Sequence, residues 1–74
     1  MATIKIDTPA TMTPSQEATV LHWRTRLIRD IAVEIDGNNG RGDVLFWMWR
    51  PRTGWRLGRI GKRGRVYFEK ERRA

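Results

Sequence analysis

The chain has 74 residues, a formal net charge of +7 and no cysteine. This length allows one small domain with a limited core, and the absence of cysteine excludes disulfides and thiolate metal sites. The longest apolar run, Val44–Trp49, is far shorter than the roughly 20 residues that a membrane helix needs. The first residues also lack the basic and apolar segments of a secretory signal, so we expect a soluble, cytoplasmic protein.

The positive charge is concentrated in one half of the chain. Residues 38–74 contain eleven Lys and Arg against three Asp and Glu, whereas residues 1–37 contain four against five. Arg outnumbers Lys by twelve to three. The planar guanidinium group pairs with carboxylates and phosphates and stacks on aromatic rings. The excess of Arg therefore predicts a surface that binds acidic protein faces or nucleic acid.

The first twelve residues contain few large apolar side chains. Ile4 and Ile6 alternate with polar neighbours, which is compatible with a short edge strand. A chain end with so little surface to bury is commonly disordered, so we expect a mobile N-terminal arm over residues 1–12.

A helix is expected from about residue 14 to residue 33. Thr13 can cap its start, Pro14 suits its first position and Gln16 completes a capping box. Arg24 lies within the apolar stripe of this helix, where a long side chain snorkels to the edge or reaches a partner through a gap. The apolar residues of the stripe are Val20, Leu21, Trp23, Leu27, Ile28 and Ile31.

The end of this helix has an alternative interpretation. Ile31, Val33 and Ile35 alternate with other residues, so residues 31–35 are also compatible with a strand. The glycine-rich residues 36–42 are expected to form a loop.

The aromatic run Val44–Trp49 predicts the first of three strands, near 44–50, 55–60 and 65–68, which are separated by turns containing glycine. Val44, Phe46 and Met48 share one face, while the opposite face carries residues 45, 47 and 49, which are also apolar. Such a strand is either central in a sheet or covered by the helix on one face and partly bare on the other.

The predicted fold class is α+β, with one amphipathic helix packed on a three-stranded antiparallel β-meander. Residues 1–12 are assigned to the mobile arm, 13–68 to a single small globular domain and 69–74 to a frayed tail of mixed charge. A small SH3-like barrel is the alternative if Ile4–Ile6 and Ile31–Ile35 both join the sheet as strands.

The sequence contains few groups that support catalysis. His22 is the only histidine, and no Ser or Asp is spaced to form a nucleophilic group with it. The carboxylates are scattered, and the loop after Asp36 lacks the closing Glu of a calcium site. We therefore expect a protein that is not an enzyme and that has no metal or cofactor. Arg63-Gly64-Arg65 is similar to the core of a minor-groove hook, but without the flanking prolines a hairpin turn explains it better.

Tryptophans and arginines alternate through the basic half of the chain. Nucleic-acid-binding proteins use such residues to stack bases and neutralise phosphates, and protein interfaces use them as hot spots. The remaining interpretation is that Trp47, Trp49 and Trp55 are core residues. The candidate partner-binding residues cluster on two turns and the strand between them, where we expect one patch: Arg50, Arg52, Trp55, Arg56, Arg59, Lys62, Arg63 and Arg65.

The layout of the whole chain resembles a known family. The segments that carry the likeness are Thr-Pro-Ser-Gln-Glu at 13–17, Leu-His-Trp-Arg at 21–24, Val-Leu-Phe-Trp-Met-Trp-Arg-Pro at 44–51 and Gly-Lys-Arg-Gly-Arg at 61–65. With these segments the chain resembles the small bacteriophage transcription regulators that lytic Xanthomonas phages make against host RNA polymerase.

The resemblance implies a monomer that binds the large subunits of bacterial RNA polymerase in the cytoplasm of an infected cell. Such a protein inhibits sigma-dependent initiation at promoters and promotes read-through of terminators, and it can lie close to nucleic acid in the transcription complex. The alternative function is a stand-alone DNA- or RNA-binding module with an Arg and Trp surface.

Overall fold

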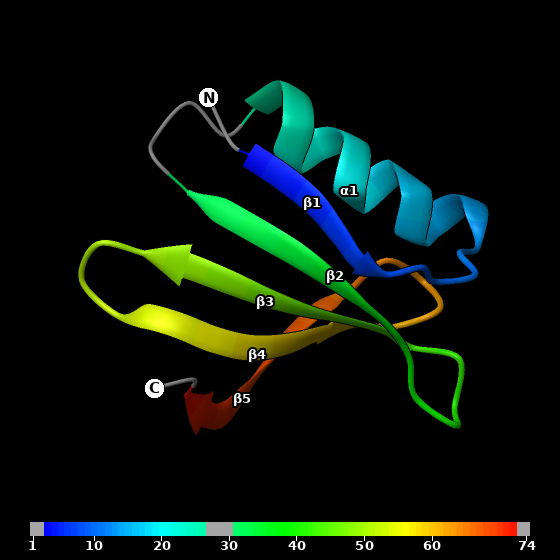
Figure 1. Ribbon diagram of the computed structural model, residues 1–74. Helices are drawn as coiled ribbons and strands as arrows, with labels where there is room; N and C mark the ends of the chain where they lie inside the picture. The colour runs from blue at the N-terminus through cyan, green and yellow to red at the C-terminus, as the bar shows by residue number, and fades with distance from the viewer. Residues whose placement is uncertain (1–2, 27–30, 73–74) are drawn as a thin grey trace.

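The computed structural model describes residues 3–26 and 31–72, which form one helix and five strands (Figure 1). In chain order these elements are β1 (Thr3–Thr8), α1 (Pro14–Arg26), β2 (Ala32–Asn38), β3 (Val44–Arg50), β4 (Gly54–Ile60) and β5 (Val66–Arg72).

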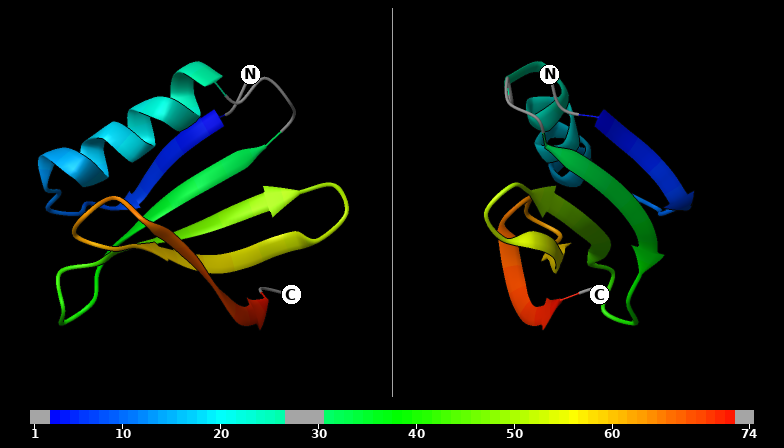
Figure 2. Two further views of the ribbon diagram at one scale, coloured as in Figure 1. Left: turned by 180° about the vertical axis from the view of Figure 1, so that it is seen from behind. Right: turned by 60° about the vertical axis from the view of Figure 1, so that its left-hand side comes forward.

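The five strands form a single mixed sheet in the order β1-β2-β3-β4-β5. β1 pairs with β2 in parallel, and α1 makes the crossover that parallel neighbours require. The remaining pairs, from β2 to β5, are antiparallel and are joined by short turns. The sheet twists strongly, so that the edge strands β1 and β5 lie on opposite sides of the molecule and α1 packs on one face (Figure 2).

The start of α1 follows the predicted capping box. The backbone N–H of Thr13 donates to Oε1 of Gln16 at 2.8 Å, and the backbone N–H of Gln16 donates to Oγ1 of Thr13 at 3.2 Å. Gln16 is fully buried, and its Nε2 also donates to the carbonyl oxygens of Gly42 and Ile60, both at 3.0 Å. The cap therefore holds the first turn of the helix against the loop before β3 and the end of β4.

A second contact fixes α1 against the turn between β4 and β5. The hydroxyl groups of Thr13 and Thr19 donate to the carbonyl oxygens of Lys62 and Gly64, both at 2.8 Å. Gly64 has a φ of 89°, and a Cβ at this position would lie 2.8 Å from the carbonyl oxygen of Ser15. Glycine is therefore required here both by the backbone conformation and by the close approach of the helix.

The core lies between α1 and the face of the sheet that it covers. Trp23 of α1 packs edge-on against Phe46, with ring centroids 4.9 Å apart. Gly58 lies opposite Phe46 and makes room for its ring, because a Cβ there would lie 2.3 Å from Cζ of Phe46. The buried apolar residues are Val20, Trp23, Val33, Ile35, Val44, Phe46, Met48 and Ile60.

The α+β class is confirmed, but the predicted three-stranded meander is too small. The meander corresponds to β3, β4 and β5, to which the structure adds β2 and the parallel strand β1. The alternative of a small barrel correctly predicted that Ile4–Ile6 and Ile31–Ile35 contribute strands to the sheet. The sheet nevertheless stays open, because β1 and β5 occupy its two ends and are not neighbours.

Four predicted segment boundaries differ from the structure. The described helix spans Pro14–Arg26 and does not reach residue 33, because Val33 and Ile35 belong to β2 and point into the core. Thr3–Thr8 is a strand and not a mobile arm, and β2 extends to Asn38 into the expected loop. The segment expected to fray from residue 69 continues β5 to Arg72. Leu27 and Ile28, expected on the helical stripe, lie outside the described residues.

Candidate functional site

The two faces of the sheet differ in what covers them. α1 packs on the face that carries Val33, Phe46 and Ile60, and no other described element covers the opposite face (Figure 2). We call this opposite face the outer face. Its central residues are half-buried and are paired across β3 and β4 as Leu45 with Arg59, Trp47 with Leu57 and Trp49 with Trp55.

The outer face is apolar because of the alternation within β3. Val44, Phe46 and Met48 are buried under α1, so the residues between them must point to the other side of the sheet. The tryptophans Trp47 and Trp49 therefore lie on a face where only neighbouring side chains shield them. Exposed apolar surface marks interaction sites on small proteins, and here the two tryptophans are half-buried.

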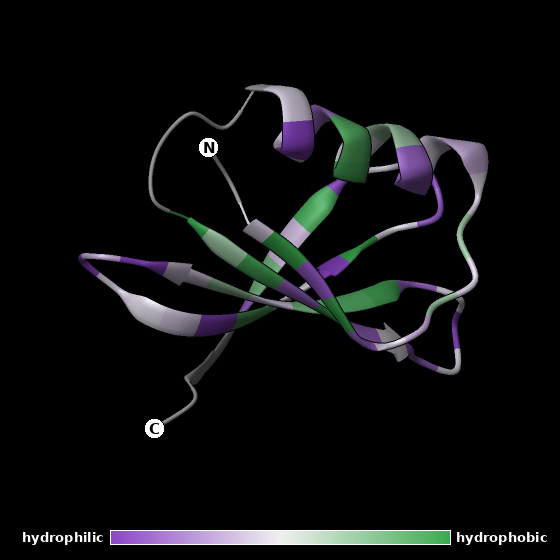
Figure 3. Ribbon diagram, turned by 45° about the horizontal axis from the view of Figure 1, so that its top comes forward, coloured by the Kyte–Doolittle hydropathy of each residue, from purple (hydrophilic) through white to green (hydrophobic). Residues whose placement is uncertain are grey.

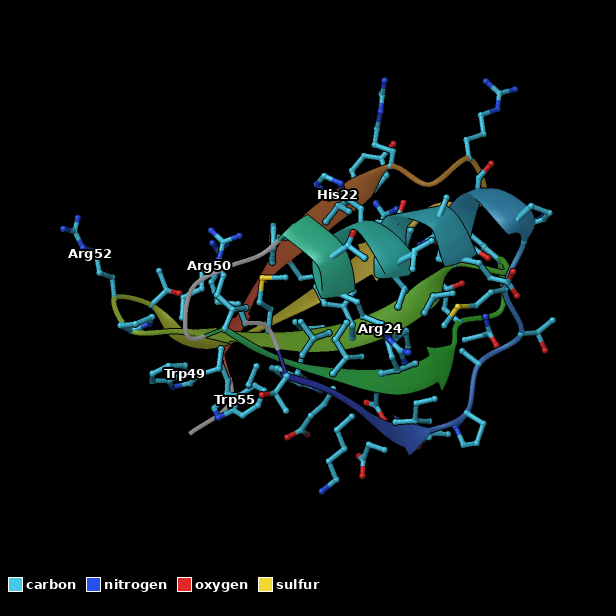
Figure 4. All side chains as sticks on the ribbon, turned by 90° about the horizontal axis from the view of Figure 1, so that it is seen from above. His22, Arg24, Trp49, Arg50, Arg52 and Trp55 are labelled. Atoms are coloured by element: carbon cyan, nitrogen blue, oxygen red, sulfur yellow. The ribbon has the colours of Figure 1, made fainter. Side chains whose placement is uncertain are left out.

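The hairpin between β3 and β4 places basic residues beside the tryptophan pair. Trp49 and Trp55 lie next to each other below the sheet, and Arg52 projects away from the turn (Figure 4). Arg50 extends on the other side, where its guanidinium carbon lies 5.8 Å from the ring centroid of Phe68. Arg52 is exposed and has no ion pair within the described part of the chain.

Arg56 and Arg59, which were predicted to contact a partner, form hydrogen bonds and ring contacts within the protein. Nε of Arg59 donates to Oε1 of Glu69 at 3.1 Å, its Nη1 lies 3.7 Å from Oδ2 of the buried Asp43, and its guanidinium stacks over Tyr67. Arg56 lies on the helix side of β4, stacks over Phe68 at 5.1 Å and donates to the carbonyl oxygen of Glu69. These contacts give Arg56 and Arg59 roles in holding β5 to β4.

The turn between β4 and β5 forms a second basic site. Lys62, Arg63 and Arg65 are exposed, and their side chains form no ion pair among the described residues. We call the depression beside them the basic hollow. It is lined by Asp43, Arg59, Lys62, Arg63, Arg65 and Tyr67.

The eight predicted residues do not form the single patch that we expected. Arg50, Arg52 and Trp55 lie at one end of β4, and the turn with Lys62 and Arg63 lies at the other end (Figure 1). The seven residues of β4 separate these groups by about 20 Å, at roughly 3.3 Å per residue. A partner that touches both groups must therefore extend along the outer face.

The sequence interpretation missed part of the outer face. Leu45, Leu57 and Tyr67 belong to it and were not among the candidates, while Trp47 and Trp49 were weighed as core residues. The alternation in β3 was the available signal, but it leaves undecided which of two apolar faces the helix covers.

His22 and the carboxylates are the remaining side chains with catalytic or metal-binding chemistry. His22 is exposed on α1 (Figure 4), and within residues 3–25 and 31–69 no three His, Asp or Glu side chains form a group that could hold a metal ion. None of the described helical residues belong to a helix that is long and apolar enough to cross a membrane. Comparisons with known protein families, with curated proteins and with solved structures gave no match.

Proposed function

We propose that this protein is a non-catalytic regulator that binds bacterial RNA polymerase, with the outer face and the β3–β4 hairpin as its docking surface. The observation that carries this proposal is the Trp49–Trp55 pair on an uncovered sheet face, next to the exposed Arg52. Trp and Arg are the residue types that most often dominate binding energy at protein interfaces. The partner surface is expected to be apolar at its centre and acidic at its rim.

The choice of RNA polymerase comes from the resemblance of the chain to phage regulators of that enzyme. The net charge of +7 supports it, because a strongly basic small protein is attracted to an acidic surface of a larger one. The expected consequences are inhibition of sigma-dependent initiation and read-through of terminators.

The test uses purified bacterial RNA polymerase, free of nucleic acid, in a binding assay and in promoter-dependent transcription. The variants are Arg52→Glu and Trp55→Ala, which change the docking surface without touching the ion pairs of Arg59. Arg41→Glu is the matched control, because Arg41 is exposed in the loop between β2 and β3 and undergoes the same change of charge. We expect both docking variants to lose affinity and inhibition, and the control to retain most of both.

Two results would overturn the proposal. If the parent protein has no effect on transcription and no affinity for the enzyme, the partner is wrong. If folded Arg52→Glu and Trp55→Ala variants inhibit as well as the parent, the docking surface is wrong even though the partner is right.

The alternative function is a nucleic-acid-binding module, which the basic hollow favours. Tyr67, 39% exposed, lies at this hollow with the guanidinium of Arg59 over one face of its ring, so a base would have to stack on the other face. Lys62, Arg63 and Arg65 are placed to neutralise phosphates. A basic protein without a base-reading site binds nucleic acid only at about 10⁻⁴ to 10⁻⁶ M. Nanomolar affinity for a twelve-residue oligothymidine, lost in Tyr67→Ala, would favour the alternative.

A further inference from the structure

A groove runs between α1 and the edge strand β1, on the side of the sheet opposite the outer face. It has a volume of about 340 Å³ and an apolar lining that includes Ile4, Ile6, Val20, Leu21 and Ile35. Ile6 is 55% exposed and Leu21 is 60% exposed, although both are large apolar side chains. Hydrophobic and hydrophilic residues alternate along β1 (Figure 3), and both isoleucines of this strand line the groove. On this side of the sheet, α1 therefore leaves part of β1 exposed.

The edge of β1 is open to pairing. Within the described residues β1 pairs with β2 alone, so the hydrogen-bonding groups on its other side face away from the sheet. Such an edge is a template for a further strand unless charges or bulges protect it. β1 contains the charged residues Lys5 and Asp7 and a register shift between Ile6 and Thr8, but its Ile4 and Ile6 line the groove. The opposite edge, β5, ends in the uninterrupted charged run Glu69-Lys70-Glu71-Arg72. Of the two edges, β1 is the one suited to receive an apolar strand.

Two charged residues, Glu17 and Arg24, are among those that line the groove. Arg24 extends from α1 toward β1 (Figure 4), is exposed, and has no hydrogen bond or ion pair among the residues that the structure describes. Glu17 also lines the groove, seven residues earlier in α1. At 1.5 Å per residue the two positions are separated by about 10 Å along the helix axis. An extended segment in the groove would meet a cation at one position and an anion at another.

We propose that this groove binds an extended segment of a partner protein, which adds to β1 as a sixth strand. Main-chain hydrogen bonds to β1 would supply affinity, and alternate apolar side chains would enter the groove between Ile6 and Leu21. An acidic side chain of the segment pairs with Arg24 and a basic one with Glu17, so the order of the two charges sets the direction of the bound strand. This site is separate from the docking surface around Trp55, which lies on the other face of the sheet.

The charges and the apolar lining of the groove favour a segment of a different protein over a second copy of this chain or a nucleic acid. A second copy of this chain would bring a further net charge of +7, which opposes close pairing of two edges. Nucleic acid would find a single cation, Arg24, in an apolar groove with Glu17, and no exposed ring on which a base can stack.

The probes are two capped eight-residue peptides of identical composition. Both contain alternating Thr and Val between charged ends, in the order Glu to Lys in one peptide and Lys to Glu in the other. Titration of the isotopically labelled full chain is followed by NMR. We expect the amide signals of Thr3–Thr8 and α1 to shift, and one order to bind about fivefold more tightly, as expected for exposed ion pairs.

The decisive variant exchanges the two groove charges, Glu17→Arg with Arg24→Glu, and keeps the net charge constant. It should reverse the preference between the peptides, whereas Arg52→Glu should leave the preference unchanged. If the exchanged variant is unfolded by circular dichroism, Arg24→Gln serves instead and should reduce the preference. A peptide with N-methyl groups on alternate residues cannot pair with β1 on its methylated side and should bind at least about tenfold more weakly.

Several outcomes would overturn this proposal. They are an absence of binding at millimolar peptide, equal affinity for both orders, equal affinity for the N-methylated peptide, or shifts confined to the outer face. Concentration-dependent shifts of β1 without peptide would assign the edge to a second copy. None of these results would bear on the binding of RNA polymerase through the outer face, which is measured with different variants.

Discussion

The side-chain amide of Gln16 donates a hydrogen bond to the carbonyl oxygen of Ile60, 44 residues later in the chain, at 3.0 Å. The same nitrogen donates to Gly42, and the amide oxygen accepts from the backbone of Thr13. One buried side chain thus joins the cap of α1, the loop before β3 and the end of β4. Every hydrogen-bonding atom of this side chain has a partner, which is why a polar group can be fully buried here.

Replacing Gln16 with Leu should destabilise the protein by about 2–3 kcal/mol, because the carbonyl groups of Gly42 and Ile60 would lose their donor within the core. The measurement is the free energy of unfolding in urea. Thr25→Ala is the control, since the hydroxyl of Thr25 bonds only within α1 at an exposed position, and it should change stability by less than about 0.5 kcal/mol. Equal effects of the two substitutions would contradict the anchoring role of Gln16.

Replacing Gly58 with Ala should cost about 1–3 kcal/mol, because the added methyl group overlaps the ring of Phe46 and the core must shift. Gly40→Ala is the matched control, since a Cβ there meets nothing within 4 Å. A double-mutant cycle with Phe46→Leu gives the coupling energy. If the smaller side chain at position 46 does not relieve part of the cost of Gly58→Ala, the overlap is not its cause.

Two tryptophans should respond differently to truncation. Trp23→Ala removes a buried ring that packs on Phe46 and should cost about 3–5 kcal/mol of stability. Trp55 lies on the outer face, so Trp55→Ala should cost less stability, and it should lower the affinity of the proposed complex with RNA polymerase by about thirtyfold. Thermal unfolding and the binding assay, applied to both variants, separate the two roles. A Trp55→Ala variant as unstable as Trp23→Ala would assign Trp55 to the structural core.

The proposed binding to RNA polymerase should weaken steeply with salt. Between 50 and 500 mM salt we expect the affinity to fall by at least about tenfold, because the exposed arginines act over distances that the salt screens. The measurement is the equilibrium dissociation constant at several salt concentrations, for the parent and for Arg52→Glu. A salt-independent constant would mean that the tryptophans dock without help from the arginines.

Patterns formed by residues close together in the sequence predicted much of the fold. The capping box of Thr13 and Gln16 located the start of α1, and the turns at Gly54 and Gly64 located the three antiparallel strands. These features depend on residues within a few positions of one another. The basic half of the chain was equally visible, because charge is a property of composition.

Contacts between distant residues decided the rest. The pairing of Ile6 with Ile35 makes strands of two segments whose local pattern also suited an arm and the last turns of a helix. The apolar faces of β3 are indistinguishable in sequence, and only the packing of Trp23 against Phe46 shows which one α1 covers.

The amino-acid sequence alone determined the α+β class, the start of α1, the β3–β4–β5 meander and the one-sided charge of this protein. The tertiary structure decided which tryptophans lie outside the core beneath α1, that the candidate arginines lie in separate groups, and that Arg24 borders an open groove. The physical reason is that capping, turns and charge depend on residues close in the sequence. The exposure of a side chain depends on segments that are far away in the sequence but close in the folded structure. A side chain on a sheet becomes buried only when another element packs against the face that carries it.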